Sequence, residues 1–290
     1  ILVDDGTYNE TLTINKNDLN ITSVNGASST IIDLGQPSET TGIWILANNT
    51  IFDGFTVMNI STTSSHAQYA VRVRGLNNII RNNIIIGQSS RDWWTDEEDS
   101  AINLDGTDTT ETANNIVENN EIYDFSAMGI QIVGSGNYNA HDNIIRNNNI
   151  HDLQYYAIAN DRSANQTIQN NTLTNIGPSG HVNDGVPAIG IIVWGSYSAG
   201  TRIVNDVGGI ETGIVLSSAQ RVRIENSRVN NNTIGIKIAN SSWIADRAED
   251  NEILESIITD NDYGILINRG VGNNGINYNL ISGNNFGLNS

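Results

Sequence analysis

The side chains that could carry out acid–base or carboxylate chemistry gather in the middle of the chain. Arg72, Arg74, Asp105 and Asp161 occupy matching places in successive, closely similar apolar segments. Two carboxylates can hydrolyse a glycosidic bond, at separations of about 5 Å for retention and roughly 6.5–9.5 Å for inversion. Arginine instead binds a substrate carboxylate through a bidentate fork, as β-elimination of a uronic acid polymer requires. Hydrolysis and elimination both remain open on these residues.

Each reaction also needs a group that moves a proton and groups that hold the sugar. His66, Tyr69 or His181 could act as base or acid in an elimination, and Asp184 or an acid within residues 92–99 could replace Asp105 or Asp161 in a hydrolysis. Aromatic rings can stack on sugars, and amides can bind hydroxyl groups. We predict catalytic roles for Asp105, Asp161, Arg72, His66, His181 and Asp184, and substrate-binding roles for Arg74, Asn103, Gln131, Tyr69, Trp93, Trp94, Trp44 and Trp194.

A repeated segment must position these residues. Runs of the form Gly-Ile-x-Ile recur around positions 43, 71, 102, 130, 158, 191, 214, 236 and 265, spaced from 22 residues (214 to 236) to 33 (158 to 191). Each is preceded by a run of the form Asn-x-Ile-x-x-Asn-x-Ile, clearest at residues 78–84, 115–122 and 143–150. Alternating Ile and Val predict short strands, and helical spacing is absent. The period predicts a solenoid of about ten three-sided coils.

Asparagine pairs mark the corners of the predicted coils. Asparagine tolerates left-handed backbone angles, so it suits a tight corner between two strands. Identical residues of successive coils can stack, and stacked asparagines can hydrogen-bond along a ladder. We therefore expect asparagine ladders along the edges of the solenoid.

Strand alternation also predicts which side chains face outward. One outward column reads Trp44, Arg72, Asn103, Gln131, Ala159, Ile192, Val215, Lys237 and Leu266. The column two residues on reads Leu46, Arg74, Asp105, Val133, Asp161, Trp194, Ser217, Ala239 and Asn268. Both are polar between Arg72 and Asp161 and apolar on either side, which predicts a sugar-binding groove; a solvated sheet face is the alternative. Asp105 and Asp161, two coils apart, should have backbones about 10 Å apart, near the inverting range.

Three insertions interrupt the repeat at one corner. They span residues 61–69, 88–100 and 177–187, each between an Asn-x-Ile run and the next Gly-Ile run. Insertions on one face of a solenoid mark its binding face, so we expect long loops beside the polar columns. Loops that pack on a neighbouring subunit are the alternative.

The repeats resemble those of right-handed parallel β-helices of the pectate-lyase-like superfamily, over essentially the whole chain. Residues 1–10 (ILVDDGTYNE) are similar to the run that follows the first cap in such proteins. The cap is missing and the last repeat is unfinished, so we expect a fragment of a longer protein. The resemblance implies an all-β, single-domain β-helix over residues 1–290. It leaves the function open, because the fold carries lyases, hydrolases, epimerases, phage spikes and surface proteins.

Catalytic signatures of the superfamily are not matched. Gly180-His181 and Gly235-Ile236-Lys237 only faintly resemble polygalacturonase motifs, at the wrong mutual spacing, and pectate-lyase signatures are absent. The acidic, asparagine-rich composition would suit disaggregatases, surface-polysaccharide enzymes of methanogenic archaea, although no diagnostic motif identifies that class.

Composition disfavours several classes of partner. The formal charge of −18 disfavours nucleic acid and anionic membranes, and no apolar run reaches transmembrane length. Cysteine is absent, so no disulfide framework exists. No metal or cofactor is required, but Ca²⁺ could bind the acidic residues 91–99 or 105–108 through oxygen ligands.

These observations predict an extracellular or cell-surface enzyme that cleaves an acidic, uronic-acid-containing polysaccharide by hydrolysis or β-elimination. The alternatives are a non-catalytic surface or assembly module, such as a trimeric spike or sheath, and a glycan-binding module.

Overall fold

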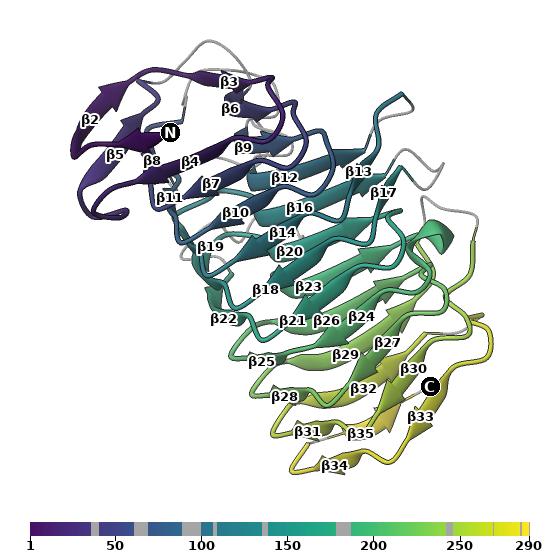
Figure 1. The fold of residues 1–290 in the computed structure, drawn as a ribbon. Coiled ribbons are helices and arrows are strands. Elements are labelled where there is room, and N and C mark those ends of the chain that lie inside the picture. The colour runs from purple at the N-terminus through teal and green to yellow at the C-terminus, as the bar shows by residue number, and fades with distance from the viewer. Residues whose placement is uncertain are drawn as a thin grey trace.

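The computed structural model describes residues 1–35, 41–60, 69–88, 100–106, 109–134, 139–177, 187–241, 246–268, 270–284 and 286–289. These residues form one right-handed parallel β-helix whose coils each contribute one strand to three long sheets (Figure 1). Eleven strands in each sheet make eleven rows, one more than the roughly ten coils predicted. The described residues contain no helix that is long and apolar enough to cross a membrane.

Sheet A is the first strand of each coil. Its strands are β1 (Leu2–Val3), β4 (Asn20–Ser23), β7 (Ile51–Asp53), β10 (Ile79–Arg81), β14 (Ile116–Glu118), β18 (Ile144–Arg146), β21 (Thr167–Gln169), β24 (Arg202–Val204), β27 (Arg223–Glu225), β30 (Glu252–Leu254) and β33 (Gly275–Asn277).

Sheet B follows sheet A in every coil. Its strands are β2 (Gly6–Asn9), β5 (Thr30–Asp33), β8 (Thr56–Met58), β11 (Ile84–Ile86), β15 (Glu121–Tyr123), β19 (Asn149–Leu153), β22 (Thr172–Ile176), β25 (Asp206–Gly208), β28 (Arg228–Asn230), β31 (Ile257–Thr259) and β34 (Leu280–Ser282).

Sheet C contains the Gly-Ile-x-Ile segments. Its strands are β3 (Leu12–Ile14), β6 (Thr41–Ile45), β9 (Tyr69–Val73), β12 (Ser100–Gly106), β16 (Met128–Gly134), β20 (Tyr156–Asp161), β23 (Ile189–Trp194), β26 (Thr212–Ser217), β29 (Ile234–Ala239), β32 (Tyr263–Ile267) and β35 (Phe286–Asn289). A short parallel pair, β13 (Thr112–Ala113) and β17 (Ala140–His141), lies between sheets C and A, and a 3₁₀ turn, η2, spans Ser196–Ser198.

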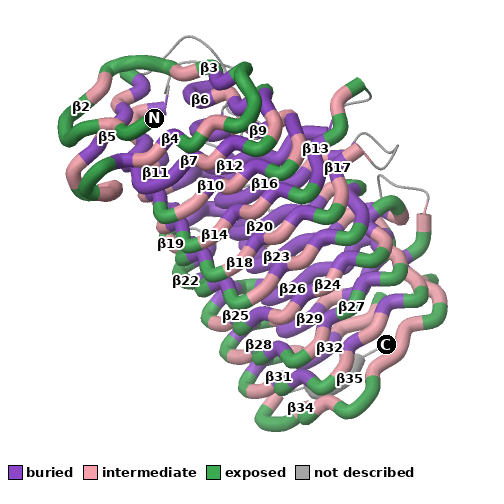
Figure 2. Tube along the Cα trace, in the orientation of Figure 1, coloured by how far each residue is buried: buried purple, intermediate pink, exposed green. Residues whose placement is uncertain are grey.

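The core fills the inside of the coil with aliphatic columns. Ile43, Ile102 and Ile130 stack in register on sheet C and are fully buried. In Figure 2 buried segments recur in every coil, whereas exposed segments gather at the corners. The glycine of the repeat is required by the close approach of coils, since a Cβ on Gly213 would lie 2.6 Å from the carbonyl oxygen of Gly235.

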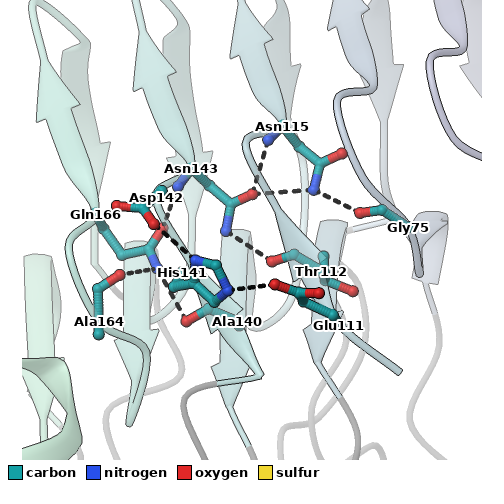
Figure 3. A network of polar contacts seen from close by, with 10 residues as sticks. All are labelled: Gly75, Glu111, Thr112, Asn115, Ala140, His141, Asp142, Asn143, Ala164 and Gln166. Carbon is teal, nitrogen blue, oxygen red and sulfur yellow. Dashed lines mark hydrogen bonds and ion pairs between the residues drawn. The ribbon is translucent and has the colours of Figure 1, made fainter. Parts of the chain in front are cut away.

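The two asparagines of each corner pair have different roles: one forms the turn and the other forms a ladder with neighbouring coils. The first adopts a left-handed backbone, with φ of 55° at Asn82 and at Asn119, as single asparagines readily do. The second is buried and stacks: the Asn83 amide N–H donates to Asn120 Oδ1 at 3.0 Å, and the Asn120 N–H donates to Asn148 Oδ1 at 3.0 Å. The predicted ladders are confirmed. Figure 3 shows a second ladder of this kind, formed by Asn115, Asn143 and Gln166.

The three insertions share one corner, as predicted. They connect β8 to β9, β11 to β12 and β22 to β23, all of which are passages from sheet B to sheet C. By contrast, β15 ends at Tyr123 and β16 begins at Met128, so a coil without an insertion turns this corner in four residues.

Candidate functional site

The polar columns lie where strand alternation predicts. Trp44 pairs with Arg72, Arg72 with Asn103, and Asn103 with Gln131 across neighbouring strands of sheet C. In the second column Asp105 pairs with Val133, which pairs with Asp161. Asp105 and Asp161 are therefore two strands apart on the same outer face.

Asp105 brings the two arginines together. Its Oδ2 atom accepts hydrogen bonds from Arg72 Nε at 3.0 Å and Nη2 at 2.6 Å, and from Arg74 Nε at 2.7 Å. Arg74 Nη2 also lies 2.6 Å from the same oxygen. The Asp105 side chain is only 9% exposed, whereas those of Arg72 and Arg74 are 18% and 29% exposed. One nearly buried carboxylate thus fixes two guanidinium groups that solvent still reaches.

Two aromatic rings support the guanidinium groups. The Trp44 ring centroid lies 4.8 Å from Arg72 Cζ and 5.1 Å from Arg74 Cζ. The Tyr69 ring lies 4.5 Å from Arg72 Cζ on the same outer face. Such cation–π contacts hold an arginine in place while leaving N–H groups for a ligand.

Beside this arginine pair the face becomes an amide network. Asn103 Nδ2 donates to Gln131 Oε1 at 2.7 Å, and Ser100 Oγ donates to the same oxygen at 3.2 Å. Asn103 and Gln131 are 1% and 6% exposed. Both amides, which were predicted to bind substrate, belong to the outward column but are buried, so their substrate-binding role stays a prediction. The Asn103 Oδ1 atom is buried without a hydrogen-bond partner.

Further along sheet C the outer face is apolar. A second cluster of buried side chains, separate from the core, covers β16, β20, β23 and β26, with Trp194 partly buried against it. Its members are Ala127, Met128, Tyr155, Tyr156, Ala159, Ile189, Ile192 and Val215. Trp194 meets the Tyr156 ring edge-on at 5.6 Å, so it serves as a packing residue of this cluster as well as a predicted sugar platform.

Asp161 carries its own partner. The guanidinium of Arg162 forms a two-point contact with it, Nε to Oδ1 at 2.9 Å and Nη2 to Oδ2 at 3.0 Å. The hydrogen bond to Asp161 raises the pKa of Arg162, and so does the negative charge of Asp161. The Asp161 side chain is 24% exposed. Both predicted catalytic aspartates are thus bound to arginine.

Several predicted residues lie outside the described part of the chain. They are His66, Trp93, Trp94, His181 and Asp184, together with most of the acidic segments considered for Ca²⁺. Their predicted roles stay predictions. Among the described residues, no three acidic or imidazole side chains converge in a way that would hold a metal ion.

The other two histidines occupy different faces and each contacts two carboxylates. His141, on β17, has Nδ1 2.7 Å from Asp142 Oδ2 and Nε2 2.6 Å from Glu111 Oε1 (Figure 3). Burial lowers the pKa of His141, but the hydrogen bonds to Asp142 and Glu111 outweigh it and raise the pKa overall. His151, on sheet B, similarly contacts Asp152 and stacks on Tyr123.

Sequence reasoning missed three contributors to these arrangements. Ser100 joins the amide network, Arg162 binds Asp161, and Glu111 binds His141. Arg162 could have been found, because it directly follows Asp161. Ser100 and Glu111 could not, since each lies where the sequence departs from the repeat and its register cannot be counted.

Comparison with known proteins places the fold. The model of the family described as the right handed beta helix region matches residues 13–207. No curated protein matches the sequence. An alginate lyase from Paenibacillus sp. str. FPU-7 has a TM-score of 0.62 and 13% identity, over 96% of this chain and 91% of its own.

Two further solved structures are similar. The Dettilon tailspike protein has a TM-score of 0.57 and 13% identity, with 99% of this chain and 61% of that chain covered. The catalytic unit of a GH87 α-1,3-glucanase from Streptomyces thermodiastaticus strain HF3-3 has a TM-score of 0.55 and 13% identity, with 100% and 62% covered. This chain therefore spans about six tenths of each of those two, and all three likenesses concern the fold.

Proposed function

This chain belongs to the right-handed β-helix family, and from that premise we propose that it binds an acidic polysaccharide on the outer face of sheet C and cleaves it there. The fold is also that of an alginate lyase and of a glucanase, so the scaffold is compatible with polysaccharide chemistry. At 13% identity, no catalytic residue of either protein can be assigned to a position in this chain.

The observation that carries the proposal is the arginine pair on Asp105. Two partly exposed guanidinium groups converge on one carboxylate oxygen in a protein of net charge −18. A single carboxylate cannot neutralise both, so the cluster keeps a positive charge that suits an anionic ligand. Planar guanidinium groups match carboxylate geometry, which makes a uronic acid residue the fitting ligand.

Among the two cleavage reactions, the contacts favour β-elimination. In that reaction a base removes the C5 proton, a C4–C5 double bond forms, and the C4–O bond breaks as the leaving oxygen gains a proton. Arg72 and Arg74 would neutralise the uronate carboxylate and so make the C5 proton easier to remove. Tyr69, His66 and His181 remain the candidates for proton transfer.

Hydrolysis by Asp105 and Asp161 fits the contacts less well. The Oδ2 atom of Asp105 already accepts from both arginines, and both carboxylate oxygens of Asp161 are engaged by Arg162. In hydrolysis the two carboxyl groups must reach the leaving oxygen and the anomeric centre or an attacking water, and these contacts occupy the oxygens that would have to do so.

Glycan binding without cleavage is the second candidate. One observation favours it: both histidines in the described part of the chain, His141 and His151, lie away from the outer face of sheet C. Under that reading Arg72, Arg74 and Trp44 would hold a uronate chain without cleaving it. We also propose an extracellular location, where such polymers occur, and we keep Ca²⁺ as an optional ligand.

Incubation with a panel of uronic acid polymers, including alginate and pectate, tests the proposal. An increase in ultraviolet absorbance, which reports the unsaturated product, identifies elimination. New reducing ends without that increase identify hydrolysis. Binding of an acidic polymer without either product would support the second candidate, a glycan-binding module. Failure to bind any acidic polymer while neutral polymers bind would refute the assignment.

A further inference from the structure

The outer face of sheet A, on another side of the coil from the arginine pair, carries a stripe of identical apolar side chains. Outward positions of four consecutive strands are isoleucine and lie in register. Each is partly exposed, while inward neighbours such as Ile80 and Ile145 are fully buried. The stripe consists of Ile51, Ile79, Ile116 and Ile144, on β7, β10, β14 and β18 (Figure 1).

A charged column runs beside the isoleucine stripe, two residues along each strand. It alternates in sign from coil to coil: Asp53, Arg81, Glu118, Arg146. Arg81 Nε lies 2.8 Å from Asp53 Oδ2, and Arg146 Nη2 lies 2.6 Å from Glu118 Oε2. The arginine side chains are 36% exposed and reach solvent beyond their partners.

If a second copy of this column runs in the opposite direction, each charge faces a charge of opposite sign. Read from β7 to β18 it is negative, positive, negative, positive, and read from β18 to β7 each sign is inverted. A two-fold axis parallel to the strands, between β10 and β14, would reverse the column in a second copy. Arg81 would then face Glu118 of that copy, and Asp53 would face its Arg146.

The same operation also matches the apolar stripe to itself. It places Ile79 against Ile116 of the second copy and Ile51 against Ile144, because the two columns share one register. A two-fold interface requires such self-complementarity. We therefore infer that two copies of this chain associate through the outer faces of sheet A, in antiparallel orientation. This inference does not depend on the proposed function.

The strands that flank the stripe are compatible with the pairing. Asn20 and Thr22 on β4 would oppose Thr167 and Gln169 on β21, so polar groups meet polar groups at both ends. The six strands from β4 to β21 span about 24 Å at ~4.8 Å per strand. A face of that length buries less than the roughly 800 Å² per partner of a standard interface. The dimer should therefore be reversible and dependent on concentration.

Sedimentation velocity over a range of protein concentrations tests the inference, using variants that leave the core untouched. Wild type should shift from monomer to dimer as concentration rises. Arg81→Glu and Glu118→Arg, each alone, should weaken dimerisation about tenfold or more, because opposite charges become like charges at two symmetric places. Arg223→Glu, on β27 outside the paired strands, should dimerise like wild type.

Mixing the Arg81→Glu and Glu118→Arg variants makes the test specific to the antiparallel pairing. The carboxylate introduced at position 81 of one variant would face the guanidinium introduced at position 118 of the other. The second symmetric contact stays native, so the mixture should dimerise where each variant alone does not. Thermal melting of each variant establishes that it is folded. A wild type that stays monomeric or forms trimers at all concentrations, or folded variants whose mixture gains no dimer, would overturn the inference.

Discussion

Arg72 Nη2 lies 2.6 Å from Asp105 Oδ2, although the two residues are 33 positions apart in the sequence. They meet because β9 and β12 are adjacent strands of sheet C and an insertion between them adds length without changing the register. Arg74 reaches the same oxygen. The solenoid thus makes one cationic site from two successive coils.

Removal of the Asp105 charge should loosen the arginine pair. Asp105→Asn keeps the side-chain shape but leaves two partly buried guanidinium groups without their counter-ion. We expect a loss of about 1–3 kcal/mol in the free energy of unfolding, the usual cost of removing one partner from a buried polar contact. Denaturant unfolding measures it, with Asp161→Asn as the control, because Asp161 is more exposed and its described ion pair is with its own neighbour Arg162. Equal effects of the two substitutions would contradict a special role for Asp105.

The asparagine ladder should stabilise the coil through its second residue and not through its first. Asn148→Ala removes the acceptor of the Asn120 N–H and the donor to the Val117 carbonyl, all buried. We expect a cost of about 1–3 kcal/mol or more in the free energy of unfolding.

Asn147 supplies the matched control for that substitution. It is exposed and left-handed, with φ of 56°. Asn147→Gly should change the free energy of unfolding little, because glycine adopts this conformation without strain. A loss at Asn147→Gly as large as at Asn148→Ala would argue against the division of roles.

The His141 contacts should make stability depend on pH. Both ring nitrogens face carboxylate oxygens, so both N–H groups can donate only when the ring is charged. Because its pKa is raised in the folded protein, its contribution is fully present below the unfolded pKa of about 6.5 and is lost as pH rises through the higher folded pKa. Melting temperature followed from mildly acidic to alkaline pH should fall, and His141→Gln should flatten that fall. An unchanged slope in the variant would reject the assignment.

That pH effect could extend to the arginine pair through one connection. Glu111 precedes Thr112, whose Oγ1 donates to the Asp105 carbonyl at 2.8 Å. If the corner loosens when His141 loses its proton, ligand affinity should decline over the same pH range. Titration calorimetry at several pH values checks this, and a parallel decline in His141→Gln would show that another group is responsible.

The sequence allowed the coils, corners and outward columns to be predicted because strands alternate with a strict period of two. Once Ile43 and Ile102 are assigned to the core, the directions of Trp44 and Asn103 follow. The asparagine ladders were predictable for the same reason. The first and last strands of sheet C, β3 and β35, lie outside the nine anchors because neither has the full Gly-Ile-x-Ile pattern.

The contacts within the site could not be predicted. Register placed Arg72 beside Asn103, but side-chain length and rotamer decide that Arg72 reaches across to Asp105 instead. Burial of Asn103 and Gln131 depends on packing above the sheet, which a periodic pattern does not report. The partners of Ser100 and Glu111 were likewise not predictable, because the sequence before each residue departs from the repeat.

The most direct test of the central claim is titration calorimetry of a uronic acid oligosaccharide against wild type and the double variant Arg72→Gln, Arg74→Gln. A charge-assisted hydrogen bond contributes about 1.5–3 kcal/mol, and 1.4 kcal/mol is tenfold in affinity. We therefore predict that the double variant binds at least about tenfold more weakly, while Arg223→Gln on sheet A binds like wild type. A folded double variant that binds the oligosaccharide as tightly as wild type would contradict the account.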